Sequence, residues 1–269
     1  MFKKLVEFSE RPLKTNDVVG GKYFIVNMIG KGSYGLTYLV KDKNGQSFVL
    51  KQLRKYKMLD ETGKNAFKRE AEVLKSFNYR GFPTLFDQFE DRNRQFIVME
   101  YKRGRTYEEL IFHDNHSFSE LEAVHQLNDL LQLVKVIHEQ GFVHRDLRIP
   151  NILKDKSDYY IIDFGLCRKI TEKNNSEEIG NDLEKKFYRE IAYKSDFYAL
   201  GHFLLFLLYS TYEPLSKKKQ GWEVELSISP LTKRILRKML QLDQAYDDVN
   251  LLINDVRDCI REEQKNVIF

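Results

Sequence analysis

The sequence predicts an α+β protein made of two lobes, a small antiparallel five-stranded lobe with one helix and a larger, mainly helical lobe. Three observations lead to this prediction. Short strand-like segments separated by turns fill the first hundred residues, the periodicity becomes helical after Gly104, and the polar loop VHRDLRIPNIL at 143–153 lies between apolar segments. The expected parts are a lead-in segment at 1–21, a small lobe at 22–101 and a large lobe at 102–269.

The composition is that of an ordinary globular protein, with 42% hydrophobic and 31% charged residues among 269. A net charge of only +4 gives no reason to expect nucleic-acid binding. The only two cysteines, Cys167 and Cys259, are too few for a disulfide framework and suit a reducing cytosol. The most apolar run, 197–209, is too short to cross a bilayer, and the charged N-terminus lacks the apolar stretch of a signal peptide. We therefore expect a cytoplasmic protein with no membrane span.

In the small lobe, apolar runs bounded by turns predict five strands. The turn Asn44–Gly45 is the strongest short-range hairpin signal in the chain. A helix is expected at 64–77, where Phe67, Ala71 and Leu74 recur on one face. The expected strands are 23–29, 36–42, 46–53, 85–90 and 95–101.

In the large lobe, an apolar stripe predicts a long helix that runs from about Leu121 to Ile137. A hairpin-like pair of strands follows around 152–153 and 160–162, and a buried helix is expected at about 195–209. Two further helices close the chain. Their expected apolar faces are Ile235, Met239 and Leu242 for one, and Val249, Leu252, Ile253, Val256 and Ile260 for the other.

The loop 143–153 carries His144-Arg145-Asp146, four further residues and then Asn151. The carboxylate of Asp146 can accept a proton from an attacking hydroxyl. The amide oxygen of Asn151 can bind a hard divalent cation, which prefers oxygen ligands.

Three other motifs supply what this loop lacks. The segment 30–35, Gly-Lys-Gly-Ser-Tyr-Gly, lies between two strands, so it is either a plain hairpin turn or a loop whose main-chain N–H groups approach phosphates. Lys51 ends the next strand, and Glu70 is expected to hold it, because Glu72 points to another side of the helix. Asp163-Phe164-Gly165 follows an apolar strand and is either an acidic turn or a second metal ligand.

Taken in this order, the motifs resemble those of the protein kinase family over residues 22–260. Asp196 and Gly201 are similar to the start of the family's buried helix, where the aspartate braces the catalytic loop. The resemblance implies a bilobal kinase fold, with 22–269 as one domain that is compact and eukaryotic-like. It also implies transfer of the ATP γ-phosphoryl group to serine or threonine hydroxyls of proteins, with Mg²⁺ or Mn²⁺ as cofactor.

By this resemblance Asp146 is the catalytic base, assisted by Lys51, Glu70 and Arg148. The metal ligands would be Asn151 and Asp163. Met99–Tyr101 resembles the segment that binds adenine. The implied ATP-binding residues are Ile29, Gly30, Lys31, Gly32, Ser33, Tyr34, Gly35, Thr37, Val49, Lys51, Met99, Glu100, Tyr101 and Leu153.

The chain departs from the family pattern beside the chemistry. Arg148 replaces a lysine, and Thr37 and Val49 alter the roof of the adenine site. The Ala-Pro-Glu motif is absent, with Glu184 the nearest acidic candidate and no arginine at 243–247 to pair with it. The substrate-presenting segment is therefore expected to be remodelled, and the protein substrate and the oligomeric state cannot be read from the sequence.

Two questions about regulation stay open. Arg145 precedes the catalytic aspartate, which in the family often accompanies control by phosphorylation; the candidate acceptors are Thr171, Ser176, Tyr188 and Tyr193. Glu177 and Glu178 offer a permanent negative partner instead. Cys167 is either a redox-sensitive thiol or a small buried side chain. Two other functions remain alternatives, a small-molecule kinase of the same fold and a nucleotide-binding pseudokinase scaffold.

Overall fold

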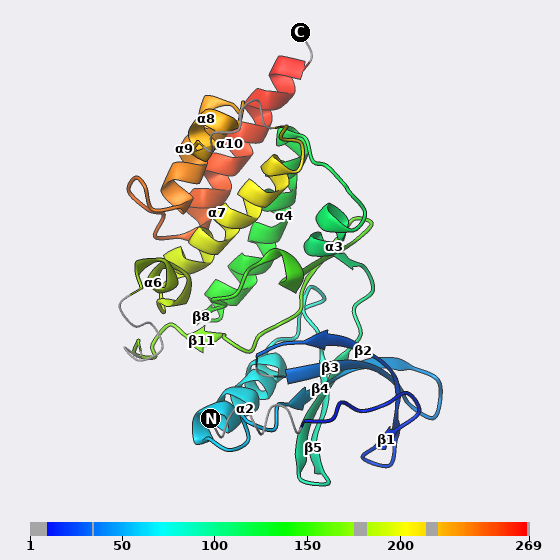
Figure 1. The fold of residues 1–269 in the computed structure, drawn as a ribbon. Helices are drawn as coiled ribbons and strands as arrows, with labels where there is room; N and C mark the ends of the chain where they lie inside the picture. The colour runs from blue at the N-terminus through cyan, green and yellow to red at the C-terminus, as the bar shows by residue number, and fades with distance from the viewer. Residues whose placement is uncertain (1–9, 34, 175–181, 214–219, 268–269) are drawn as a thin grey trace. The chain divides into compact units, whose positions relative to one another are not determined.

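The computed structural model of the chain describes residues 10–33, 35–174, 182–213 and 220–267 (Figure 1). The chain forms two compact units. The small unit comprises Met1–Arg103 and Phe164–Leu166, and the large unit comprises Gly104–Asp163 and Cys167–Phe269.

The small unit contains one antiparallel sheet, in the strand order β1-β2-β3-β4-β6-β5. The five expected strands are all present. The expected number was too low by one, because Val18–Val19 in the presumed lead-in pairs with Tyr23–Phe24 and adds an edge strand. The strands are β1 (Val18–Val19), β2 (Tyr23–Lys31), β3 (Gly35–Lys41), β4 (Ser47–Leu53), β5 (Leu85–Asp91) and β6 (Arg94–Glu100).

The two faces of this sheet have different side chains. One face forms an apolar core of buried residues: Val19, Tyr23, Ile25, Leu36, Tyr38, Val40, Phe48, Leu50, Phe96 and Val98. The other face carries Thr37, Val49, Lys51 and Met99, because Thr37 lies opposite Lys51 and Val49 lies opposite Met99. Since side chains alternate along a strand, these four predicted nucleotide residues share the face that the core does not use.

The one helix of the sheet unit, α2 (Glu61–Ser76), begins three residues before its predicted start. Asp60 caps it, because its carboxylate accepts a hydrogen bond of 2.6 Å from the main-chain N–H of Gly63. Phe67 and Leu74 are buried on its inner face, as the periodicity predicts. Glu70 is buried on the helix as well, which brings a carboxylate to the interior of the unit.

Aromatic rings tie the segment after α2 to Phe164, which belongs to the small unit although Asp163 before it does not. The ring of Phe164 lies 5.4 Å from that of Phe77 and 5.2 Å from that of Phe82. Offset and edge-on contacts of this kind stabilise a buried cluster.

The large unit is built around α4 (Glu120–Glu139), which packs against α7 (Tyr193–Tyr209) and α10 (Val249–Val267), while α7 also packs against α9 (Pro230–Met239) (Figure 1). Ser119 and Glu122 form a capping box at the start of α4. Leu242 was wrongly assigned to the apolar face of α9, because the helix ends at Met239 and Leu242 is 54% exposed. No helix among the described residues combines the length and apolar character needed to span a membrane.

Short elements complete the large unit. Strand β8 pairs with β11, and β9 pairs with both β7 and β10, so the loop 144–151 leaves one small ladder and enters another. The shorter helices were not predicted, since they are too brief to show periodicity. The elements are β7 (Arg105–Thr106), α3 (Tyr107–Phe112), β8 (Phe142–Val143), η1 (Ile149–Asn151), β9 (Ile152–Asp155), β10 (Asp158–Ile161), β11 (Arg168–Lys169), α6 (Leu183–Arg189) and α8 (Trp222–Glu225).

Candidate active site

In the small unit, Lys51 and Glu70 form an ion pair. The Nζ atom of Lys51 donates a hydrogen bond of 2.6 Å to Oε1 of Glu70, and the two side chains are only 10% and 3% exposed. Glu72, in contrast, is 65% exposed and lies 3.9 Å from Lys68. Helix α2 therefore aims Glu70, and not Glu72, at the lysine, and the low exposure strengthens the attraction between the two charges.

The glycine-rich loop connects β2 to β3 beside this lysine. The main-chain N–H of Gly32 donates a hydrogen bond of 2.9 Å to the carbonyl oxygen of Gly35. A Cβ atom on Gly35 would lie 3.0 Å from Cγ of Lys51, so glycine gives the lysine side chain room that a larger residue would reduce by a few tenths of an ångström. A Cβ on Gly32 would meet no described atom closer than 3.8 Å, so contacts with the described residues do not explain that glycine. Tyr34, also predicted here, lies outside the described residues.

The other predicted nucleotide residues of the small unit follow the strands. Ile29, on β2, is 47% exposed, and Lys31 and Ser33 are exposed too. Met99 is buried near the end of β6, and Tyr101 is the first residue beyond the strand.

The side chain of Glu100 is engaged inside the unit. Its carboxylate accepts a hydrogen bond of 3.2 Å from the main chain of Thr84 and lies 2.8 Å from the ammonium of Lys102. Burial alone would raise the pKa of Glu100, but these two partners lower it overall. The side chain of Glu100 is thus a structural partner, and its main-chain N–H also donates a hydrogen bond of 2.9 Å to the carbonyl of Thr84.

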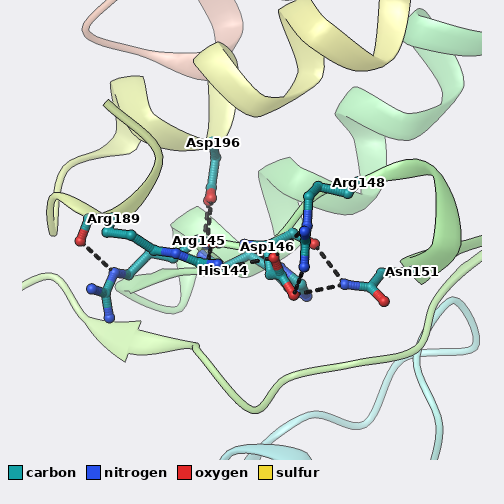
Figure 2. Close-up of polar contacts among 7 residues, drawn as sticks. All are labelled: His144, Arg145, Asp146, Arg148, Asn151, Arg189 and Asp196. Atoms are coloured by element: carbon teal, nitrogen blue, oxygen red, sulfur yellow. Dashed lines mark hydrogen bonds and ion pairs between the residues drawn. The ribbon is translucent and has the colours of Figure 1, made fainter. Parts of the chain in front are cut away.

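In the large unit, the carboxylate of Asp146 is surrounded by hydrogen-bond donors (Figure 2). The amide nitrogen of Asn151 donates two hydrogen bonds to Asp146, one of 2.8 Å to Oδ2 and one of 3.0 Å to the main-chain carbonyl. The guanidinium of Arg148 lies 2.7 Å from Oδ1 and 3.2 Å from Oδ2. This fork fixes the plane of the carboxylate, which a lysine in place of Arg148 would not do.

Asp196 points from α7 to the main chain of the same loop and holds it in place (Figure 2). This residue is fully buried in the first turns of α7, and its carboxylate accepts hydrogen bonds of 2.9 and 2.7 Å from the main-chain N–H groups of His144 and Arg145. Burial alone would raise the pKa of Asp196, but the contact with His138 and the main-chain donors lower it overall. The ionised carboxylate therefore stabilises a loop in which Arg145 adopts a φ of 66°.

The predicted metal ligands Asn151 and Asp163 are brought to one end of the β9–β10 ladder. Ile152 lies opposite Ile161, and the pairing continues with a hydrogen bond of 3.1 Å from the N–H of Ile162 to the carbonyl of Asn151. Because the amide nitrogen of Asn151 is bound to Asp146, its Oδ1 atom faces away from that carboxylate. An amide oxygen and a carboxylate at one edge fit a hard divalent cation such as Mg²⁺. Leu153, predicted beneath the adenine, is buried on β9.

Arg189, at the end of α6, is a residue of this site that the sequence did not reveal. Its Nη1 atom donates a hydrogen bond of 2.6 Å to the carbonyl of Arg145 and lies 3.5 Å from Oδ1 of Asp146. Arg189 belongs to no recognisable motif. The only hint of it in the sequence was a cationic residue in the segment where the Ala-Pro-Glu motif is absent.

The candidate phosphorylation sites differ in their surroundings. Thr171 is exposed. The hydroxyl of Tyr193 donates a hydrogen bond of 3.2 Å to the carbonyl of His138, and burial against neighbouring rings raises the pKa of Tyr188. Ser176, Glu177 and Glu178 lie outside the described residues, so the choice between a phosphate and a permanent acidic partner for Arg145 stays open.

In the family, the glutamate of the Ala-Pro-Glu motif pairs with an arginine of the large lobe, and no such pair occurs among the described residues. Glu184 is exposed at the start of α6, and the nearest arginine to 243–247, Arg237, is bound to Asp243 and Glu223. Cys167 is fully buried, and burial raises the pKa of its thiol, which disfavours the reactive thiolate.

Comparisons with known proteins agree with this arrangement. A family model described as "Protein kinase domain" matches residues 23–262. The chain is 32% identical over 262 residues to "Probable serine/threonine-protein kinase YbdM" of Bacillus subtilis, covering 97% of each protein. It is 30% identical to "Calcium-dependent protein kinase 4" of Plasmodium berghei, covering 86% of this chain and 48% of that protein. It is 27% identical to "Serine/threonine-protein kinase B" of Synechocystis sp., covering 83% and 44%. The chain thus spans nearly all of the Bacillus protein and about half the length of the other two.

Proposed function

The chain belongs to the protein kinase family, and from this premise we propose that it transfers the γ-phosphoryl group of ATP to serine or threonine hydroxyls of protein substrates. The observation that carries the proposal is the contact of 2.8 Å between Asp146 and Asn151, which links a proton acceptor to an oxygen donor for a cation. The similarity to the serine/threonine kinases from Bacillus and Synechocystis supports the serine/threonine class.

Asp146 is proposed as the catalytic base. Its carboxylate accepts hydrogen bonds from Arg148 and Asn151, which keep one orientation of the group without protonating it. A carboxylate held in this way can orient a substrate hydroxyl and accept its proton as the bond to phosphorus forms. Arg148 is half-exposed, so its guanidinium also offers a cation to the γ-phosphate.

Lys51 is proposed to bind the α- and β-phosphates, with Glu70 holding its ammonium in place. The glycine loop covers the phosphates through its main chain, and the open space beside Gly32 supports this role. The adenine is proposed to contact Ile29, Thr37, Val49, Met99, Leu153 and the main chain of Glu100 and Tyr101.

Asn151 and Asp163 are proposed to hold Mg²⁺, or Mn²⁺, through their side-chain oxygens. When bound, the cation would neutralise charge on the β- and γ-phosphates. In terms of domains, we propose that residues 22–101 form the nucleotide-binding lobe and 102–269 the catalytic lobe of one kinase domain, after a lead-in at 1–21.

The test is a transfer assay with radiolabelled ATP and Mg²⁺, with the protein itself and a generic basic protein as acceptors. We expect label on serine or threonine in acid hydrolysates, and its loss in Asp146→Asn. Asp258→Asn, a change of the same kind at an exposed position of α10, is the matched control and should keep full activity.

Other outcomes would identify the alternatives. Nucleotide binding without transfer to any protein would mean that the chain is a pseudokinase scaffold. Transfer to small molecules alone would mean a small-molecule kinase, and label on tyrosine would contradict the serine/threonine class.

A further inference from the structure

The small unit contains a cavity of about 300 Å³ at the edge of the sheet, where residues just before β1 meet the end of β4 and the turn between β5 and β6. None of the described residues proposed to bind ATP lines it. Its polar lining comprises Glu10, Arg11, Gln52, Lys55, Arg92 and Arg94, together with Asn93 of the turn. The volume is at the lower end of the range for small-ligand sites.

The lining is cationic in effect. Among the described residues of the lining, Glu10 is the one carboxylate, and that group is already paired with the buried guanidinium of Arg54 and accepts a hydrogen bond of 2.6 Å from the main-chain N–H of Lys55. Among the described residues, Arg11, Arg92 and Arg94 have no carboxylate within 4.0 Å. Three guanidinium groups without acidic partners therefore line one small cavity, and guanidinium is the side chain best suited to phosphate oxygens.

Gln52 supplies an independent indication of a ligand. The residue is only 2% exposed, it lines the cavity, and its Oε1 atom has no hydrogen-bond partner among the described residues. Buried side-chain amides are nearly always hydrogen-bonded in folded proteins, so an amide left without a partner calls for an explanation. Because the two ends of an amide exchange by a half-turn, Gln52 can present an N–H donor to an anion in the cavity.

The turn that carries Arg92 is held in an unusual conformation. Arg92 and Asn93 have φ angles of 50° and 57°, and Asp91 pairs with Arg94 across them. Such two-residue turns favour asparagine and glycine, and a residue with an ordinary side chain at positive φ is uncommon. A costly conformation that places a guanidinium at a cavity is of the kind found at ligand sites.

The cavity wall is connected to the glycine loop. Arg54, which pairs with Glu10, also donates a hydrogen bond of 3.1 Å from Nη1 to the carbonyl oxygen of Gly32. The hydroxyl of Tyr56 donates a further hydrogen bond to the carbonyl of Ser33. Displacement of Glu10 by a ligand would therefore act on the main chain that is proposed to cover ATP.

We propose that this cavity binds a phosphate monoester, held by Arg11, Arg92, Arg94 and the amide of Gln52, and that its occupancy changes the affinity for ATP through Glu10, Arg54 and Gly32. The binding site stands without the proposed function, and only the effect on ATP rests on it. The phosphate group has two possible sources, a phosphorylated residue of a peptide and a small phosphorylated metabolite.

The binding test is calorimetric titration of the full chain, without nucleotide, with three probes: inorganic phosphate, glycerol 3-phosphate and a phosphoserine pentapeptide with its unphosphorylated form as a blank. We expect a saturable site for the phosphorylated probes and not for the blank. If the phosphopeptide binds about tenfold more tightly than glycerol 3-phosphate, the source is a peptide. If glycerol 3-phosphate binds about tenfold more tightly, the source is a metabolite. A tenfold difference in affinity corresponds to about one strong charged contact. Absence of saturable binding by all three probes would overturn the proposal.

Two variants with a matched control assign the site. Arg92→Ala/Arg94→Ala should weaken binding at least about tenfold, whereas Lys14→Ala/Lys41→Ala, which removes two exposed cations of the same unit outside the cavity, should not. Gln52→Leu removes the unpartnered amide at similar volume, so it should unfold at the same or a higher temperature and yet bind the probes more weakly. Unchanged binding in both lining variants would overturn the assignment.

The effect on ATP is measured separately, from the dissociation constant of ATP with and without a saturating phosphorylated probe. A change of threefold or more, lost in Arg92→Ala/Arg94→Ala, is the expected result, and an unchanged constant would overturn the link to Gly32. If the chain bound the probes and failed to bind ATP at all, the failure would belong to the proposed function and the cavity site would stand.

Discussion

Arg145 and Arg189 each donate a hydrogen bond from the guanidinium group to the main-chain carbonyl of the other residue. The distance from Nε of Arg145 to the carbonyl of Arg189 is 2.7 Å, and that from Nη1 of Arg189 to the carbonyl of Arg145 is 2.6 Å (Figure 2). This reciprocal contact joins the end of α6 to the loop that carries Asp146. The segment in which the family's Ala-Pro-Glu motif is absent is thus attached to the proposed catalytic loop by a different route.

Arg189→Ala is expected to lower kcat about tenfold with little change in KM for ATP, because Arg189 positions the loop that carries Asp146. The loss of one such positioning contact corresponds to about 1.4 kcal/mol of transition-state stabilisation. Steady-state kinetics with varied ATP measures both constants. Lys185→Ala, an exposed cation on the same helix, is the control and should behave as the unchanged protein. An equal rise in KM and fall in kcat would contradict a positioning role.

Glu70→Gln is expected to destabilise the small unit by about 3–5 kcal/mol, because it removes the carboxylate from a buried ion pair of 2.6 Å with Lys51. Denaturant unfolding measures the loss, and Glu72→Gln at the exposed neighbouring site should change stability by less than about 0.5 kcal/mol. The double variant Lys51→Met/Glu70→Met should recover most of the stability and none of the phosphoryl transfer. A double variant as unstable as the single one would argue against the broken buried ion pair as the cause.

Arg148→Lys is expected to reduce kcat, because an ammonium replaces the fork that contacts both oxygens of Asp146. A fall of about tenfold corresponds to the loss of one charged hydrogen bond. Arg257→Lys, exposed on α10, is the control. Full activity in Arg148→Lys would mean that only the positive charge at this position matters.

A pH effect is expected from His144, because burial lowers the pKa of this fully buried histidine below the ordinary value of 6.5. The acidic groups that face it (Asp146, Asp163 and Asp196) oppose this shift, and Arg189 adds to it. Between the lowered pKa and 6.5 the unfolded chain binds a proton that the folded chain does not. The free energy of unfolding should therefore fall as the pH drops below about 6.5, with a limiting slope of about 1.4 kcal/mol per pH unit.

Unfolding free energies of the unchanged protein, His144→Asn and the exposed control His113→Asn, measured from pH 7.5 to 5, test this expectation. The slope should flatten in His144→Asn alone. A slope that is the same in all three proteins would assign the pH dependence to other groups.

Local sequence patterns predicted much of this protein. Alternation identified five strands, helical periodicity separated Glu70 from Glu72, and the order of short motifs indicated the family. These features could be read because each depends on residues close together in the chain, where the period of a strand or helix decides which side chains share a face.

The remaining features depended on the tertiary structure. Val18–Val19 is too short to show a period and becomes a strand only because Tyr23–Phe24 offers a partner. Gln52 looked like any strand residue, and only the structure showed that its buried Oε1 atom has no hydrogen-bond partner in the described parts of the chain. The contact between Arg145 and Arg189 leaves no trace in the sequence, because each guanidinium binds a main-chain carbonyl, which every residue type possesses. The sequence alone indicated which groups are candidates for phosphoryl transfer, Arg148 among them, and only the tertiary structure showed that Arg189 holds the loop that carries Asp146.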